Sequence, residues 1–205
     1  CLSLDRLAHA ISERTRAIML VSANGRTPSA GFEAYHEIAS RFGIPIIEDA
    51  AQSLGSHYPD GAHVGTKGAI GSFSFSAPKI ISTGQGGALV TNDDHSAERI
   101  RRLKDFGRAK GGIDVHDSIG FNFKFTELQA AVGLAQLDKL PWRIERKREI
   151  HQRYQLRLEG VCGIELFAHD LERTTPWFID ALVEQRQSLG EYLARMGIGT
   201  RVMYP

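Results

Sequence analysis

The sequence predicts an α/β fold in which helices flank a mainly parallel sheet, followed by the start of a small α+β domain. Strand and helix patterns alternate over residues 16–48 with short links, which is typical of a parallel crossover. The run at 44–48 is almost continuously apolar before its acidic end, as in strands buried on both faces of a sheet. After Gly160 the elements become shorter, which marks the second domain.

Composition excludes several classes of protein. A hydrophobic content of 42% is ordinary for a globular chain, and 25 basic against 24 acidic residues give a net charge of only +1. This balance favours neither nucleic acid nor a membrane surface as a partner. No apolar run approaches the ~18 residues of a membrane span. Cys1 and Cys162 show no metal or redox spacing, which fits a reducing cytoplasm.

The first quarter of the chain carries clear start and stop signals. Ser3 precedes a helical apolar pattern, Asn24 and Gly25 end a β-branched run, and Gly43 follows a second helical pattern as a C-terminal cap. The expected elements, in order, are a helix at 4–11, a strand at 16–22, a helix at 32–42 and a strand at 44–48.

The middle of the chain begins with a long loop at 50–67, and loops of this length beside strand ends are often functional. His57 and Tyr58 in this loop are candidate substrate contacts. Thr126 and Gln129 have the spacing of a capping box, and Pro141 suits the first turn of a helix. The expected elements are strands at 69–74 and 87–91 and helices at 96–106, 126–137 and 141–158.

The domain boundary is expected inside this last helix, which gives a large domain at 1–150 and the beginning of a small one at 151–205. The chain starts without methionine, and a strand pattern runs up to its last residues, so we expect a piece of a longer protein. The elements expected after Gly160 are strands at 163–167, 176–183 and 199–203 and a helix at 186–196.

Four chemical groups are delivered to one edge of the predicted sheet. Asp49 and Gln52 follow the strand at 44–48, where ligands bind in open α/β sheets. Ser74 and Lys79 follow the strand at 69–74. Asp49 has an alternative role as the cap of the turn that follows it, and Ser74 as an ordinary strand serine.

Lys79 is the candidate nucleophile. An amine that attacks a carbonyl must be partly neutral, and desolvation lowers a lysine pKa towards that state. Lys79 follows an apolar strand, Pro78 precedes it, and Gly84 to Gly87 come shortly after. The alternative is an ordinary surface lysine at a strand end.

These motifs, in this order, resemble the DegT/DnrJ/EryC1/StrS family of sugar aminotransferases over nearly the whole chain. The matching segments are EDAAQ at 48–52, SFSF at 72–75, Lys79, GQGGALVTN at 84–92, and GFNFK at 120–124 followed by QAA at 129–131.

The resemblance implies fold type I and pyridoxal 5'-phosphate (PLP) as cofactor. Lys79 would bind the cofactor covalently and move protons, and Asp49 would pair with the ring nitrogen. Gln52 would lie near the ring and its 3′ oxygen, and Ser74 would bind the phosphate. Asn122 would reach the phosphate in a neighbouring subunit, which implies a homodimer with shared active sites.

The activity implied is transfer of an amino group, with glutamate as donor, to a nucleotide-linked keto-sugar. The GFNFK segment and the helix after it resemble the perosamine synthase branch. The product would enter O-antigen, other polysaccharide or antibiotic sugar biosynthesis in the cytoplasm.

Three alternatives compete with this interpretation. A sugar dehydratase that uses pyridoxamine phosphate would carry histidine in place of Lys79. A regulatory or binding protein on the same scaffold would not need Lys79 and Asp49. A dinucleotide-dependent dehydrogenase is excluded because Gly84 to Gly87 lacks the G-x-G-x-x-G spacing and precedes a strand pattern, not a helix.

Overall fold

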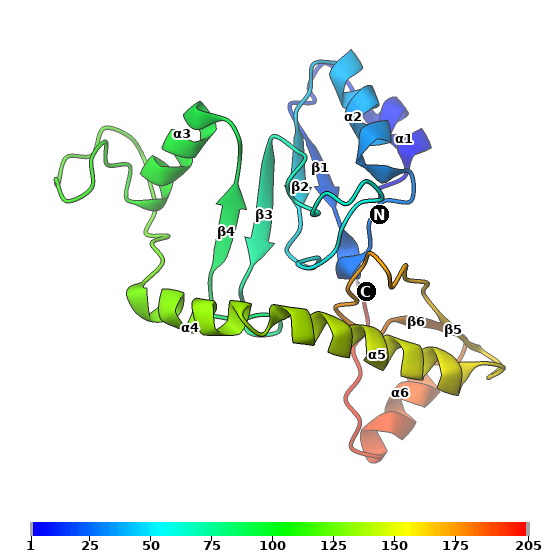
Figure 1. Ribbon diagram of the computed structural model, residues 1–205. Coiled ribbons are helices and arrows are strands. Elements are labelled where there is room, and N and C mark those ends of the chain that lie inside the picture. The colour runs from blue at the N-terminus through cyan, green and yellow to red at the C-terminus, as the bar shows by residue number, and fades with distance from the viewer. Residues whose placement is uncertain (1, 204–205) are drawn as a thin grey trace.

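A four-stranded sheet organises the computed structural model, which describes residues 2–203 (Figure 1). The strands lie side by side in the order β1, β2, β3, β4; the first three are parallel, and β4 is antiparallel to β3. The mainly parallel α/β sheet predicted from the sequence is therefore confirmed. The strands are β1 (Ile18–Val21), β2 (Ile46–Asp49), β3 (Ile70–Ser74) and β4 (Gly87–Val90).

The hydrophobic core lies between β1, β2 and two helices, α1 (Leu4–Ala10) and α2 (Gly31–Arg41). Phe32, Tyr35 and Ala39 repeat at helical spacing on α2, so they share one face, and that face is buried. Gly43 has a φ of 64°, the left-handed geometry that ends a helix at little cost for glycine. Both helices were predicted from this pattern.

Three further helices follow the sheet: α3 (Asp94–Lys104), α4 (Glu127–Leu137) and α5 (Leu140–Leu158). Asp93 caps α3 by accepting the backbone N–H of Ser96, so this helix begins two residues before its predicted start. Thr126 and Gln129 form the predicted capping box, and Pro141 lies in the first turn of α5. No helix in the part of the chain described here is both long and apolar enough to cross a membrane.

Helix α5 passes across the carboxyl ends of the parallel strands (Figure 1). Arg143 donates to the carbonyl of Ile80 at 2.9 Å, and Lys147 donates to the carbonyl of Trp177 at 2.7 Å. One helix therefore holds both the segment after β3 and a segment almost a hundred residues later.

The last part of the chain contains a two-stranded antiparallel sheet, β5 (Ile164–Leu166) with β6 (Ala181–Val183), and helix α6 (Arg186–Arg195). Residues 199–203 form no strand, so that prediction was wrong: a strand needs a hydrogen-bonded neighbour, and this sheet contains only β5 and β6. The division at 150 stays a prediction, and α5 crosses it without a break.

The strand predicted at 176–183 is confirmed only for its last three residues. The N–H groups of Trp177 and Phe178 donate to Asn24, at 3.3 and 2.7 Å, and so are not available to a strand ladder. This segment packs instead on the loop after β1, where η1 (Ala23–Gly25) forms a single turn.

Candidate active site

The site is built at the carboxyl ends of β2 and β3. Asp49 ends β2 and lies in register with Val21 on β1 and Ser72 on β3. Ser74 ends β3, and the chain then turns through Pro78 to Lys79. The sheet register therefore brings the predicted residues to one edge, as expected from sequence.

One small pocket at this edge is lined by three of the five predicted residues, Gln52, Ser74 and Lys79. Its other walls come from the loop after β2, from the residue after Lys79 and from the segment before β6. These remaining lining residues are Ala51, Leu54, Ile80, Thr175, Pro176 and Trp177.

Lys79 is partly buried, and burial is the main reason why its pKa is lowered from the usual lysine value. The negative charge of Asp49 acts in the opposite direction and raises the same pKa. The Lys79 ammonium lies 3.9 Å from the centre of the Trp177 ring, a cation–π distance. The Trp177 indole N–H donates to the carbonyl of Pro78 at 2.9 Å, which fixes the ring beside the lysine.

Asp49 also performs the local role that the sequence left open. Its Oδ1 accepts the backbone N–H of Ala51 at 3.0 Å, which is the turn-capping contact of an aspartate after a strand. This bond uses one carboxylate oxygen. The electrostatic coupling of Asp49 to Lys79 shows that the carboxylate also acts on the pocket.

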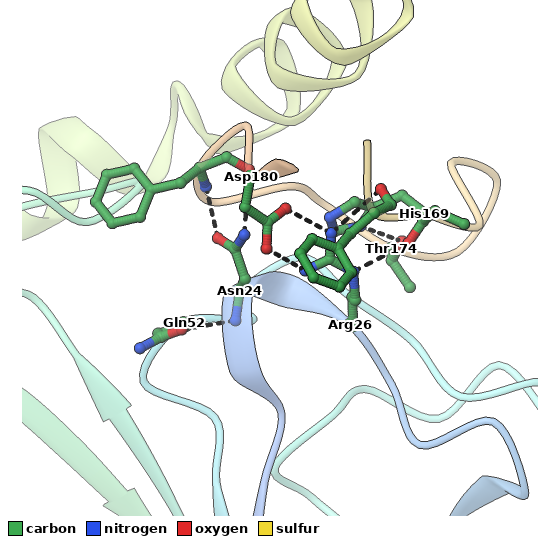
Figure 2. Close-up of polar contacts among 9 residues, drawn as sticks. Asn24, Arg26, Gln52, His169, Thr174 and Asp180 are labelled. Carbon is green, nitrogen blue, oxygen red and sulfur yellow. Dashed lines mark hydrogen bonds and ion pairs between the residues drawn. The ribbon is translucent and has the colours of Figure 1, made fainter. Parts of the chain in front are cut away.

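Ser74 and Gln52 present a hydroxyl and an amide. The hydroxyls of Ser74 and Ser76 lie 3.1 Å apart, and Ser74 Oγ also accepts the Ser76 N–H at 3.4 Å. Gln52 Oε1 accepts the backbone N–H of Asn24 at 2.6 Å (Figure 2). Both side chains are thus oriented by neighbours while they line the pocket.

Asn122 does not line this pocket. It is exposed in the loop between α3 and α4, where its backbone pairs with Asp105 in an isolated bridge. The single chain therefore brings four of the predicted residues together and leaves the fifth on the surface.

Sequence reasoning missed Trp177 and Asn24. Trp177 lies 98 positions after Lys79, a separation that no local pattern spans, although a tryptophan directly after Pro176 in an apolar run is a visible signal. Asn24 was read only as part of a turn. Its φ of 57° confirms that turn, and its contacts with Gln52 and Phe178 go beyond it.

His57 and Tyr58 do not line this pocket. Tyr58 is only 1% exposed, and its hydroxyl donates to Glu48 Oε2 at 2.8 Å. Within residues 2–203 no group of three or more potential metal ligands is clustered. The chemistry offered by the pocket is therefore that of an amine, a carboxylate, a hydroxyl and an amide.

This donor set fits PLP. A half-buried amine with a lowered pKa suits reaction with an aldehyde, and a carboxylate nearby suits a protonated pyridine nitrogen. The Ser74 hydroxyl is a donor for a phosphate oxygen, and the Gln52 amide suits a ring oxygen. Gly84 to Gly87 lead into β4, which agrees with the exclusion of a dinucleotide fingerprint.

Comparison with known proteins supports the same conclusion. The sequence matches the DegT/DnrJ/EryC1/StrS aminotransferase family over residues 1–205. It is 36% identical over 208 residues to GDP-perosamine synthase of Escherichia coli O157:H7, covering 100% of this chain and 56% of that protein.

Solved structures show the same fold. The aminotransferase TlmJ from Streptoalloteichus hindustanus superposes with a TM-score of 0.89 at 30% identity, over 98% of this chain and 56% of that one. DesI, solved in the presence of its TDP-sugar product, superposes with a TM-score of 0.86 at 31% identity, over 98% of this chain and 52% of that one.

The chain thus spans about half the length of the relatives it matches. Aminotransferases of this family depend on PLP. The match covers every segment that forms the pocket, from the end of β2 to Trp177. The chain belongs to the DegT/DnrJ/EryC1/StrS aminotransferase family.

Proposed function

We propose that the protein is a PLP-dependent aminotransferase that transfers an amino group to a nucleotide-linked keto-sugar. The observation that carries this proposal is Lys79, a partly buried amine of lowered pKa in a pocket with Ser74 and Gln52. Bound PLP would supply the aldehyde and the electron-accepting ring.

The chain's own groups have distinct tasks in this proposal. The Lys79 amine would hold the cofactor covalently until the amino donor takes its place, and the freed Nζ would then accept and return the proton that moves during transfer. Asp49 holds a negative charge where the pyridine nitrogen needs a proton. Ser74 donates to the phosphate, Gln52 orients the ring, and Trp177 excludes water from one side of Lys79.

The substrate class is supported by the relatives. One is named GDP-perosamine synthase and another was solved with its TDP-sugar product, so both act on sugars linked to a nucleoside diphosphate. Glutamate is the proposed amino donor. We also propose a role in O-antigen, other polysaccharide or antibiotic sugar biosynthesis, which the name of the perosamine synthase relative supports.

We further propose a homodimer in which Asn122 completes the phosphate site of the partner subunit. Asn122 is exposed and does not line its own chain's pocket. Large apolar side chains between residues 113 and 142 are also exposed, which is typical of an interaction surface. Those more than 60% exposed are Val115, Ile119, Phe123, Leu128, Leu134 and Trp142.

A cytoplasmic location is proposed as well. Cys162 is a free and exposed thiol, which suits a reducing compartment. The two rival functions are less well supported. Lys79 argues against the dehydratase that uses pyridoxamine phosphate, and the presence of Asp49 together with Lys79 argues against a protein that only binds.

The test is a transfer assay with the full protein, PLP, ¹⁵N-glutamate and a panel of nucleotide-linked 3-keto- and 4-keto-sugars. We expect ¹⁵N in one sugar, detected by mass spectrometry, and a loss of at least about 10²-fold in rate for Lys79→Ala. Lys110→Ala, on an exposed loop, is the matched control and should keep full activity. A dehydrated sugar without nitrogen would favour the dehydratase, and no turnover of any sugar would contradict the proposal.

A further inference from the structure

Asn24 has an unusual position in the fold. It follows β1 at the carboxyl edge of the sheet, is only 1% exposed, and has φ 57° and ψ 28° in the left-handed region. Asparagine tolerates this region better than most residues, because its short amide can form local hydrogen bonds. Its neighbour Gly25 is buried too, and a Cβ there would lie 1.9 Å from the carbonyl oxygen of Thr175.

Asn24 bonds to Gln52 and to the segment before β6, both of which contribute residues to the pocket (Figure 2). Its backbone N–H donates to Gln52 Oε1 at 2.6 Å, and its backbone carbonyl accepts the N–H of Trp177 at 3.3 Å. Its side-chain amide bonds to both backbone groups of Phe178: Oδ1 accepts the N–H at 2.7 Å, and Nδ2 donates to the carbonyl at 3.3 Å. One buried residue therefore connects Gln52 to the segment 177–178.

These two partners line the pocket that holds the reactive amine. Gln52 and Trp177 line the same pocket as Lys79, and the Trp177 ring lies 3.9 Å from Lys79 Nζ. Nothing in the side chain of Asn24 touches Lys79. Any effect on the lysine must therefore act through Trp177 or Gln52.

An ion pair close to Asn24 also connects the loop after β1 to the segment before β6. Arg26 binds both carboxylate oxygens of Asp180, at 2.9 and 2.6 Å, and donates to the carbonyls of Phe167 and Ala168 (Figure 2). The chain around residue 178 is thus held in place. Asn24 shares the positioning of Trp177 with Lys147, which donates to the Trp177 carbonyl, and with Pro78, which accepts the indole N–H.

We propose that Asn24 is a positioning residue that holds Trp177 against Lys79 and orients the Gln52 amide, which lines the same pocket. The effect of Asn24 on the pKa of Lys79 does not depend on whether the cofactor is bound. The effect on PLP, through Gln52 and Trp177, rests on the proposed function.

Asn24→Gly is the variant that isolates the side-chain amide, because glycine adopts the left-handed backbone freely. The variant loses the two bonds to Phe178 and the side-chain contact with Asp180, and it keeps the backbone bonds to Gln52 and Trp177. The readout is reductive methylation of Lys79 with formaldehyde and cyanoborohydride in the full protein, followed by mass spectrometry across pH. Only the neutral amine reacts, so the midpoint of the profile reports the Lys79 pKa, whatever its accessibility.

We expect the midpoint to rise in Asn24→Gly, because Trp177 moves away and burial, the largest cause of the lowered Lys79 pKa, decreases. Loss of the cation–π contact, which favours the charged amine, offsets only part of this rise. A rise of about half a pH unit or more corresponds to about a threefold drop in the neutral fraction at a pH below the midpoint. In a Trp177→Ala background, Asn24→Gly should cause no further shift, since the two residues act on Lys79 together.

Ser56→Ala is the matched structural control. Ser56 Oγ donates to the carbonyl of Gly25 at 2.8 Å and accepts the N–H of Thr175 at 2.9 Å, so its loss also removes two bonds at this junction. We expect a similar loss of thermal stability and an unchanged Lys79 midpoint. An unchanged midpoint in Asn24→Gly, an equal shift in Ser56→Ala, or additive shifts with Trp177→Ala would each overturn the proposal.

Cofactor affinity is measured separately by absorbance titration with PLP. We expect weaker binding in Asn24→Gly than in Ser56→Ala. If the wild-type protein binds no PLP at all, the proposed function fails, while the methylation profiles still decide the role of Asn24.

Discussion

The position of Lys79 in the fold changes the pKa of an ordinary lysine side chain. Its pKa is lowered by burial, although the Asp49 charge works against that shift and the Trp177 ring lies at cation–π distance. The neutral fraction of the amine is therefore larger than on an exposed lysine at the same pH. The residue type was identified from sequence, but its environment depends on a tryptophan from the other end of the chain.

His169 is a second residue whose surroundings oppose its charged form. Its Nδ1 lies 3.2 Å from Thr174 Oγ1, which itself donates to a backbone carbonyl, so Nδ1 carries the proton. Its Nε2 is buried without a hydrogen-bond partner among the described residues. Burial is the main cause that lowers the pKa of His169 to about 4; electrostatic interactions with Arg26 and then His151 add to it, and Asp180 opposes it.

This shift predicts a pH dependence of stability. Between about pH 6.5 and pH 4 the unfolded chain binds a proton at His169 and the folded chain does not, so the free energy of unfolding falls as the pH falls through this window. We expect a loss of about 1 to 3 kcal/mol from this residue. Urea unfolding at pH 7, 6, 5 and 4 measures it.

His169→Phe keeps an aromatic ring and removes the titration. Its stability should fall less steeply with pH than that of the wild-type protein over the same window. Because other groups titrate equally in both proteins, the difference between the two curves isolates His169. Parallel curves would show that burial of this histidine is not linked to folding.

At the scale of an element, β2 places two neighbouring acids on opposite faces of the sheet, and their surroundings differ. Glu48 is 1% exposed, and Asp49 is partly buried at the strand end. The Glu48 carboxylate accepts the hydroxyl of Tyr58 at 2.8 Å and the N–H groups of Gly65, Lys67 and Gly68 at 2.7, 2.7 and 2.5 Å. It therefore anchors the long loop after β2 from inside.

Glu48→Gln is expected to destabilise the fold by about 2 to 4 kcal/mol, since an amide NH₂ would face donors that now bind a carboxylate oxygen. Denaturant unfolding measures this loss. The control is Glu37→Gln, which breaks an exposed pair with Arg41 on α2 and should stay within about 0.5 kcal/mol of the wild-type value. Equal stability of the two variants would contradict the anchoring role.

The regular elements were predictable because their signals are local. The capping box at Thr126, the proline at 141 and the glycine at 43 each act within a few residues, and all were confirmed. The strand predicted at 199–203 was not confirmed, because a strand needs a hydrogen-bonded partner, and sequence periodicity does not reveal that partner. The pairing of Tyr58 with Glu48 was not predictable either, because it is defined by the path of the loop.

At the scale of the whole molecule, the pocket forms where segments distant in sequence meet. The loop after β1 and the segment before β6 are about 150 residues apart, yet Asn24 bonds to Phe178 and Arg26 to Asp180. The end of each strand could be predicted to carry site residues, since parallel strands share one edge. The far wall, with Trp177, could not, because no pattern in the chain links it to Lys79.

The proposed sharing of active sites predicts that two defective chains repair each other. Lys79→Ala inactivates the site to which that chain contributes its lysine, and Asn122→Ala inactivates the site of its partner. Co-refolding equal amounts gives half heterodimers, each with one intact site of two, so about a quarter of wild-type activity should return. Activity no greater than that of the two variants measured separately would show that Asn122 does not act across a dimer.

The most direct measurement is borohydride trapping. The full protein is mixed with PLP, reduced with borohydride and digested, and the modified peptide is located by mass spectrometry. A pyridoxyl group on Lys79 is the expected result, lost in Lys79→Arg and retained in Lys110→Arg. No adduct on Lys79 in the folded protein, or an adduct on other lysines alone, would contradict the assignment of Lys79 as the residue that binds PLP.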